Sequence, residues 1–338
     1  MSAPGLTTWP APPGPVAAPV RVLRAAEEDG TGRLTAATAV TVGADEPVLP
    51  GHYPHFPIFP GVCVIECVHL SGLRAAPPAA GRLRLAGVES ARFLSPVFPG
   101  DDLDVHLTWT GGPDTWRCAA KVTSPRGAAA QVRLRFAAAG APDAASASDM
   151  APVQDTPSGQ DVTIGQDGIR RILPHRYPML LLDRVTGLVP DRRITAVKAV
   201  TCNEPWYGRP GPVAGDAPAP GSDEAAAWAY PPVLLAESWC QAAGLLAIWD
   251  PDGRDVLAGR VMLFGGISDV EYLAPVLPGD VVEHRAAVSR MLGDTVIFQG
   301  TSVVDGRPVM RVASAVLAFR PAGQLRADGA EGAGRADD

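Results

Sequence analysis

The chain has 338 residues, which is enough for two domains of ordinary size. Hydrophobic residues make up 46% of it and charged residues 19%, as in a soluble globular protein. A net charge of -7 without a basic tract argues against nucleic-acid binding. No apolar run approaches the roughly 20 residues that a membrane-spanning helix needs, so no membrane association is expected.

Cysteine usage and the amino terminus bear on the cellular compartment. The five cysteines contain no C-x-x-C pair, and Cys63 and Cys67 suit small buried side chains on one helix. This pattern fits a reducing compartment and contains no metal-binding motif. Residues 1–20 have neither a basic segment nor the unbroken apolar run of a signal peptide, so the sequence predicts a cytoplasmic protein.

In chain order, the first half predicts an α+β unit. Residues 1–19 are rich in proline and alanine and are expected to be disordered or loosely docked. A buried helix is predicted from Gly61 to about Ala76, because apolar residues recur at helical spacing after Pro60 and two prolines end the run. Alternating or β-prone segments predict an antiparallel meander around it, with strand candidates at 20–25, 33–42, 82–94, 101–110, 115–125 and 128–138.

The second half repeats the first. RFLSPVFPGDDL at 92–103 recurs as EYLAPVLPGDVV at 271–282. FPGVCVIECVHLSG at 59–72 recurs as YPPVLLAESWCQAAG at 230–244. An internal repeat of this length indicates two copies of one structural unit in a single chain.

The repeat and the composition together divide the chain. Between the copies lies a low-complexity Ala, Ser, Asp and Pro segment, which predicts a flexible linker. The predicted divisions are a disordered amino end at 1–19, a first unit at 20–136, the linker at 137–164, a second unit at 165–320 and a disordered carboxyl end at 321–338.

The strongest chemical signal lies in the stretch from Gly51 to Glu66, GHYPHFPIFPGVCVIE. It places a histidine on the loop before the predicted helix and a carboxylate five residues into that helix, which is a candidate acid–base pair. Pro60 and Gly61 begin the helix, so free backbone N–H groups are expected at its first turn. An isolated pair of this kind more often serves structure than catalysis, and the surrounding pattern decides between the two.

This stretch resembles the active-site segment of bacterial β-hydroxyacyl-ACP dehydratases of the FabA/FabZ type. Their pattern is a Gly-His-Phe-Pro turn, then Pro-x-x-Pro-Gly-Val, with the acid fourteen residues after the histidine; His52 and Glu66 have that spacing. RILPHRYPMLLLDRV at 171–185 is similar to another segment of the same family. The resemblance covers both halves. It implies a double hotdog, an α+β fold with two long central helices, each wrapped by an antiparallel sheet, and the two sheets joined edge to edge.

The two halves are unequally complete relative to that family. The first half has His52 in its Gly-His turn and Gly61 at the helix start, but Leu70 stands where the family has glutamine. The second half keeps the Glu-x-x-x-Gln pattern in Glu237 and Gln241. It has lost the Gly-His-Phe-Pro turn, and a second proline replaces the glycine at its helix start. A proline has no N–H to donate.

In this family, the histidine and the glycine N–H come from one hotdog and the acid from the other. A similar arrangement is found in polyketide-synthase dehydratase domains. The resemblance therefore implies one complete site, with His52 as the base, Glu237 as the acid, Gln241 to orient the acid, and the backbone N–H groups of Gly61 and Val62 as oxyanion donors. A vestigial second site is expected at Glu66. The alternative is that His52 pairs with Glu66 of its own half.

Other residues are assigned more general positions. Tyr53, His55 and Phe59 are candidates for the lining of a substrate tunnel. Tyr53 stands where the family often has phenylalanine, so its hydroxyl is an extra polar group. His175, in the LPHRYP segment, is predicted to be structural, and His284, in a strand candidate, is predicted to lie on the surface.

The implied activity is that of a hydro-lyase. It removes water from a 3-hydroxyacyl thioester to give a trans-2-enoyl thioester, in a specialised fatty-acid or polyketide pathway. This chemistry needs no metal or redox cofactor, and the partner is an acyl carrier protein, or CoA, that carries the 3-hydroxyacyl chain. Two alternatives stay open: a hotdog thioesterase or enoyl isomerase, and a non-catalytic acyl-binding scaffold subunit. The fused halves form a pseudo-dimer within one chain, and a homodimer of such chains is also left open.

Overall fold

The computed structural model describes residues 14–53, 56–112, 114–138, 162–207, 228–250, 252 and 259–321. His55, most of the predicted linker, and most of both predicted terminal tails lie outside these residues. Residues 16–18 are docked: Val16 and Ala18 are buried, and the Glu46 carboxylate accepts the N–H groups of Ala17 and Ala18. Disorder of the amino end therefore does not extend to residue 19. Nor does the linker begin at 137, since the last strand of the first half runs to Ala138.

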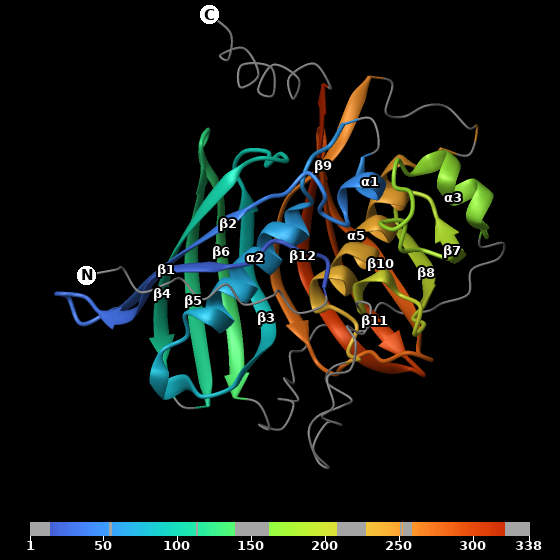
Figure 1. The fold of residues 1–338 in the computed structure, drawn as a ribbon. Coiled ribbons are helices and arrows are strands. Elements are labelled where there is room, and N and C mark those ends of the chain that lie inside the picture. The colour runs from blue at the N-terminus through green and yellow to red at the C-terminus, as the bar shows by residue number, and fades with distance from the viewer. Residues whose placement is uncertain are drawn as a thin grey trace, which may run out of the picture.

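The first half, as far as it is described, packs one long helix against six antiparallel strands (Figure 1). Its helices are α1 (Leu49–His52), α2 (Gly61–Arg74) and the short 3-10 helix η1 (Pro78–Ala80). Its strands are β1 (Arg21–Glu28), β2 (Leu34–Thr41), β3 (Leu83–Phe93), β4 (Asp102–Gly111), β5 (Thr115–Ser124) and β6 (Gly127–Ala138).

The second half repeats this arrangement. Its helices are α3 (Gln166–Ile172), the short 3-10 helix η2 (Pro205–Tyr207) and α5 (Pro232–Ile248). Its strands are β7 (Arg184–Val189), β8 (Arg193–Ala199), β9 (Arg260–Tyr272), β10 (Val281–Leu292), β11 (Thr295–Val304) and β12 (Arg307–Pro321).

The described strands form one sheet, in the order β1-β2-β4-β5-β6-β3-β9-β12-β11-β10-β8-β7. Read outward from its centre, the order is the same in both halves. The halves meet where β3 and β9 pair antiparallel, with Val88 opposite Val270 and Ala91 opposite Ile267. This pairing covers the part of each inner edge from Gly87 to Arg92 and from Gly266 to Glu271. The predicted double hotdog, with its sheets joined edge to edge, is confirmed.

The two long helices lie next to each other in the hollow of the sheet (Figure 1). α2 begins at Gly61, as predicted, and ends at Arg74, two residues before the expected Ala76. The earlier end follows from Pro77, which disfavours helical backbone at the residue before it. α5 is buried without a break from Val233 to Leu246, and its residues there are apolar except for Glu237, Ser238 and Gln241. No helix in the described part of the chain is both long and apolar enough to cross a membrane.

Matching loop contacts show that the repeat is structural as well as sequential. In each Pro-Gly-Asp turn, the aspartate carboxylate accepts a backbone N–H three residues earlier. Asp101 accepts from Phe98 and Asp280 accepts from Leu277, both at 2.8 Å. These turns lead into β4 and β10, so the equivalent strands of the two halves begin in the same way.

Candidate active site

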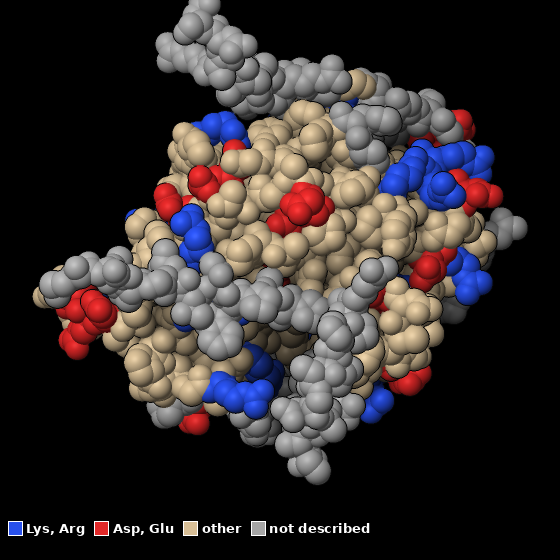
Figure 2. Space-filling model, in the orientation of Figure 1, with Lys and Arg blue, Asp and Glu red and all other residues tan. Residues whose placement is uncertain are grey.

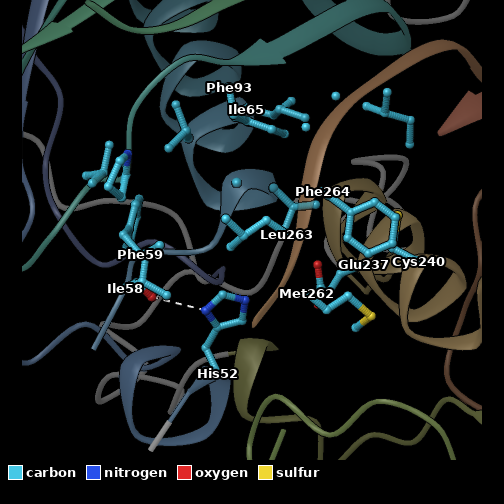
Figure 3. A pocket seen from close by; sticks show the side chains of 18 of the residues that line it. His52, Ile58, Phe59, Ile65, Phe93, Glu237, Cys240, Met262, Leu263 and Phe264 are labelled. Atoms are coloured by element: carbon cyan, nitrogen blue, oxygen red, sulfur yellow. Dashed lines mark hydrogen bonds between the residues drawn. The ribbon is translucent and has the colours of Figure 1, made fainter. Parts of the chain in front are cut away.

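A cavity of about 470 Å³ lies between the two halves and draws its walls from both. The first half contributes the Gly-His turn, the start of α2 and part of β3; the second half contributes α5, β9 and the LPHRYP segment. In Figure 3, His52 and Glu237 extend toward the same space, and apolar side chains such as Phe93 and Ile65 lie beyond them. A pocket of this kind, with a few polar groups in an apolar wall, is typical of a small-molecule site.

His52 is the last residue of α1 and is partly buried. Its Nδ1 lies 3.0 Å from the Ile58 carbonyl oxygen. Because a carbonyl only accepts, Nδ1 carries the hydrogen and the lone pair of the neutral ring is on Nε2. Burial lowers the pKa of His52 to about 4, and the hydrogen bond to Ile58 opposes part of that shift. The ring is therefore neutral at physiological pH and able to accept a proton.

The turn that carries His52 rests on the second half of the chain. The Arg176 N–H donates to the Gly51 carbonyl at 2.7 Å, so the LPHRYP segment runs directly beneath the turn. A Cβ built on Gly51 would lie 2.3 Å from the Arg176 carbonyl oxygen. Only glycine allows the two backbones to approach so closely, and this approach places a first-half histidine in a cavity walled by the second half.

Replacing Gly51 with alanine should therefore destabilise the protein. The added methyl group meets backbone atoms, which cannot rotate away, so we expect a loss of about 1–3 kcal/mol in the free energy of unfolding. Chemical denaturation measures this change. Gly30→Ala is the matched control, because a Cβ there meets nothing within 4 Å. Equal stability of the two variants would show that the contact at Gly51 is not required.

Glu237 lies in the second turn of α5 and is 8% exposed. Its Oε1 accepts a hydrogen bond from Gln241 Nε2 at 3.0 Å. Burial raises the pKa of Glu237, and the bond from Gln241 opposes that shift. Gln241 is itself held at both ends of its amide: Nε2 also donates to the Met179 carbonyl at 2.7 Å, and Oε1 accepts the Leu181 N–H at 3.0 Å. The carboxyl group is thus fixed in orientation and shifted toward its protonated form.

His175 lies in the same site, although the sequence suggested only a structural role for it. Its Nε2 is 3.5 Å from Glu237 Oε1, and its ring centre is 5.3 Å from that of His52. Burial, and then the neighbouring His52, hold the pKa of His175 well below its usual value. Its Nδ1 has no hydrogen-bond partner among the described residues. The clue in the sequence was the match of LPHRYP to a family segment, which did not reveal that this segment underlies the Gly-His turn.

His52, His175 and Glu237 also offer the kinds of atoms that bind metal ions. One ligand atom from each lies within 4.8 Å of the others. On a tetrahedral zinc ion, ligand atoms are about 3.4 Å apart, and the 3.5 Å between His175 Nε2 and Glu237 Oε1 is already close to that spacing. The three side chains are therefore close enough together to act on one small group in the cavity.

The predicted tunnel and oxyanion residues line the cavity where the structure describes them. Gly61 and Val62 are at the first turn of α2, and Tyr53 and Phe59 line the wall. The Tyr53 hydroxyl donates to the Met262 carbonyl at 2.8 Å, which ties the turn to β9. That hydroxyl is therefore engaged with the protein, and its contribution is to join the two halves.

Glu66 is placed differently from Glu237. Its Oε2 lies 3.0 Å from Nδ1 of His69 on the same helix, and Glu66 is not among the described residues that line the cavity. The geometry therefore brings His52 together with Glu237 and not with the acid of its own half. The surface position predicted for His284 is wrong: the residue is fully buried, because two serine hydroxyls satisfy its ring nitrogens.

Comparisons with known proteins agree with this architecture. Residues 27–129 match the ApeI-like family model, described as ApeI dehydratase, and residues 228–313 match the FabA-like domain. The dehydratase domain of PpsC from Mycobacterium tuberculosis, solved in complex with C12:1-CoA, has the same fold. Its TM-score is 0.54 at 13% identity, over 88% of this chain and 98% of that one.

Two curated relatives establish the family. The 3-hydroxyacyl-[acyl-carrier-protein] dehydratase FabZ of Campylobacter curvus is 34% identical over 140 residues, which is 41% of this chain and 86% of the relative. The protein of the same name from Symbiobacterium thermophilum is 40% identical over 125 residues, or 36% and 76% of the two chains. With a match of this extent on a fused, two-unit fold, the chain belongs to the FabZ family of dehydratases.

Proposed function

We propose that this protein removes water from a 3-hydroxyacyl thioester to give a trans-2-enoyl thioester, with His52 as the base and Glu237 as the acid. One observation carries the proposal. A histidine whose pKa is lowered and a carboxyl group whose pKa is raised face one apolar cavity from different halves of the chain. A pair of titratable groups shifted in opposite directions is the signature of acid–base catalysis near neutral pH.

The elimination follows from these two protonation states. His52 Nε2 takes the proton from C2 of the substrate, and the released electron pair forms the bond between C2 and C3. The bond between C3 and its hydroxyl oxygen breaks, and that oxygen takes the proton of Glu237 and leaves as water. One proton moves onto His52 and one leaves Glu237, so the site returns to its starting state once a proton passes back between them.

The thioester carbonyl makes the C2 proton acidic because it accepts the negative charge that develops. The first N–H groups of a helix have no partner within the helix, and they lie at its positive end. Gly61 and Val62 occupy this position at the start of α2 and line the cavity. Preorganised donors of this kind stabilise an enolate oxygen. A side chain at Gly61 would meet the Phe93 ring at 2.8 Å, so glycine also lets that ring pack against the start of α2.

The acyl chain is delivered by an acyl carrier protein in this proposal. Two observations support a carrier. The FabZ relatives are named for acyl-carrier-protein substrates, and basic side chains gather in the region of α3 (Figure 2). Arg170 and Arg171 are exposed in the last turn of α3, four to five residues before His175 in the cavity wall. An acidic carrier bound there would be held beside the site by charge complementarity.

Incubation of the protein with a 3-hydroxybutyryl thioester of acyl carrier protein, followed by mass spectrometry, tests the activity directly. We expect a product lighter by one water. The rate should rise as the pH passes about 4, where His52 loses its proton, and fall as the pH passes the raised pKa of Glu237. The neighbouring His175 and Tyr53 stay neutral across this window, because burial lowers the pKa of the first and raises that of the second.

Two other outcomes would contradict the proposal. Release of the free acid would indicate a thioesterase. No conversion of either the carrier or the CoA thioester at any pH would indicate an acyl-binding subunit without catalysis.

A further inference from the structure

A buried polar cluster connects α5 to the sheet behind it. His284, on β10, is 0% exposed, and so are the two serines that it contacts. Its Nδ1 lies 2.8 Å from Ser302 Oγ on β11, and its Nε2 lies 2.8 Å from Ser238 Oγ on α5. None of the three residues lines the described cavity, so the proposed reaction does not use them directly.

One arrangement of hydrogens satisfies the whole cluster. Ser238 donates its hydroxyl hydrogen to the Leu181 carbonyl at 3.3 Å, so it accepts from His284 Nε2–H. Nδ1 of the neutral ring then accepts from the Ser302 hydroxyl. Burial lowers the pKa of His284 to about 3, which keeps the ring neutral, and the two hydrogen bonds select this tautomer. The cluster is therefore rigid, with every donor matched to an acceptor.

The cluster of His284, Ser238 and Ser302 adjoins the proposed acid, Glu237. Ser238 follows Glu237 in the sequence, and the Leu181 segment that it contacts is also held by Gln241, whose Oε1 accepts the Leu181 N–H. Gln241 in turn donates to the Glu237 carboxyl. Ser238 and Gln241, which are three residues apart on α5, therefore both hydrogen-bond the backbone of Leu181. His284 connects Ser238 to Ser302 in the sheet.

The first half has no such cluster at the equivalent positions. Cys67 follows Glu66 as Ser238 follows Glu237, and Val105 follows its Pro-Gly-Asp turn as His284 follows its own. Val105 pairs with Val122 across β4 and β5, as His284 pairs with Ser302 across β10 and β11. All three first-half residues are apolar and buried. The fold therefore does not need polar groups here, and buried polar groups cost desolvation wherever they occur.

We infer that His284 is a positioning residue: through Ser238 it fixes the turn of α5 that presents Glu237 to the substrate. The cluster is confined to the half whose acid faces the cavity, which a general structural role would not explain. The inference rests on the proposed function, since it assigns a purpose to the precise placement of the acid.

The most direct test gives the second half the residues that the first half has at the equivalent positions. The triple variant Ser238→Cys, His284→Val, Ser302→Val replaces the cluster by the residues found at Cys67, Val105 and Val122. We expect it to fold with a melting temperature close to that of the wild type, because the ring and both hydroxyls are removed together and the new thiol can still donate weakly to the Leu181 carbonyl. Its kcat should fall on the order of tenfold with KM within about twofold, because a displaced acid affects the transition state more than substrate binding. The single variant His284→Gln, whose side-chain amide can still donate and accept hydrogen bonds, should keep most of the wild-type kcat.

Controls separate the possible failures. Ser238→Ala changes little volume on a helix, so it tests the same link even if the triple variant does not fold, and its kcat should also fall. Ser71→Ala breaks the buried hydroxyl pair with Thr38 in the first half and should leave kcat unchanged.

A folded triple variant with full kcat, or Ser238→Ala with full kcat, would overturn the inference. Full activity in Glu237→Gln, measured alongside, would instead overturn the proposed acid, and the inference with it.

Discussion

Glu237→Gln is expected to lower kcat by on the order of a thousandfold, which is the range that one acid contributes in general acid–base catalysis. Glutamine has nearly the same shape and still accepts the hydrogen bond from Gln241, but it has no proton acidic enough to give to the departing hydroxyl. Burial should not penalise the change, because a neutral amide replaces a carboxyl group that burial already holds toward neutrality. Steady-state dehydration, with circular dichroism to verify the fold, measures the effect.

Glu66→Gln is the matched control for this variant. Glu66 occupies the equivalent position on α2, where it contacts His69 and does not line the cavity. We expect kcat within about twofold of the wild type. If Glu66→Gln lost activity and Glu237→Gln kept it, the working pair would lie within the first half, and the assignment across the halves would be wrong.

His52→Ala should have an effect of similar size, on the order of a thousandfold in kcat, because it removes the Nε2 lone pair that takes the C2 proton in the proposed reaction. The variant leaves a space beside the Ile58 carbonyl that imidazole added to the solution can occupy. We therefore expect partial recovery of the rate with increasing imidazole. Recovery of this kind would not follow from a variant that had merely lost its fold.

Two histidines serve as comparisons for His52. His106→Ala, at an exposed position on β4, should leave the rate unchanged. His175→Ala removes the other ring of the site, which contacts the acid at 3.5 Å. A thousandfold loss in His175→Ala, together with an active His52→Ala, would move the base to His175.

Much of the architecture could be predicted because it depends on local signals. Pro60 and Gly61 mark the start of α2, and the two Pro-Gly-Asp turns mark equivalent strand starts in both halves. The pairing of His52 with Glu237 could be predicted because each half lacks what the other retains. The structure places the two side chains at one cavity; their roles await the variants above.

The remaining features depend on contacts between distant residues. The docking of Ala17 and Ala18 depends on a carboxylate at Glu46, which composition alone does not reveal. His284 was predicted to lie on the surface as a polar residue of a strand candidate, although it shares a strand face with Val282 and Ala286, which are apolar and buried. Its burial depends on Ser238, 46 residues earlier, and Ser302, 18 residues later. The period of one strand does not report whether two other elements supply partners for a buried ring.

The antiparallel pairing of β3 with β9 within one chain determines how the assembly of the site depends on protein concentration. Where two separate subunits must meet to form a site, the fraction assembled depends on their concentration. Here the halves are parts of one molecule, so each meets its partner at an effective concentration in the millimolar range, whatever the protein concentration in the cell. Fusion also frees the halves from having identical sequences. One can retain the base and the other the acid, which two copies of a single short chain could not do.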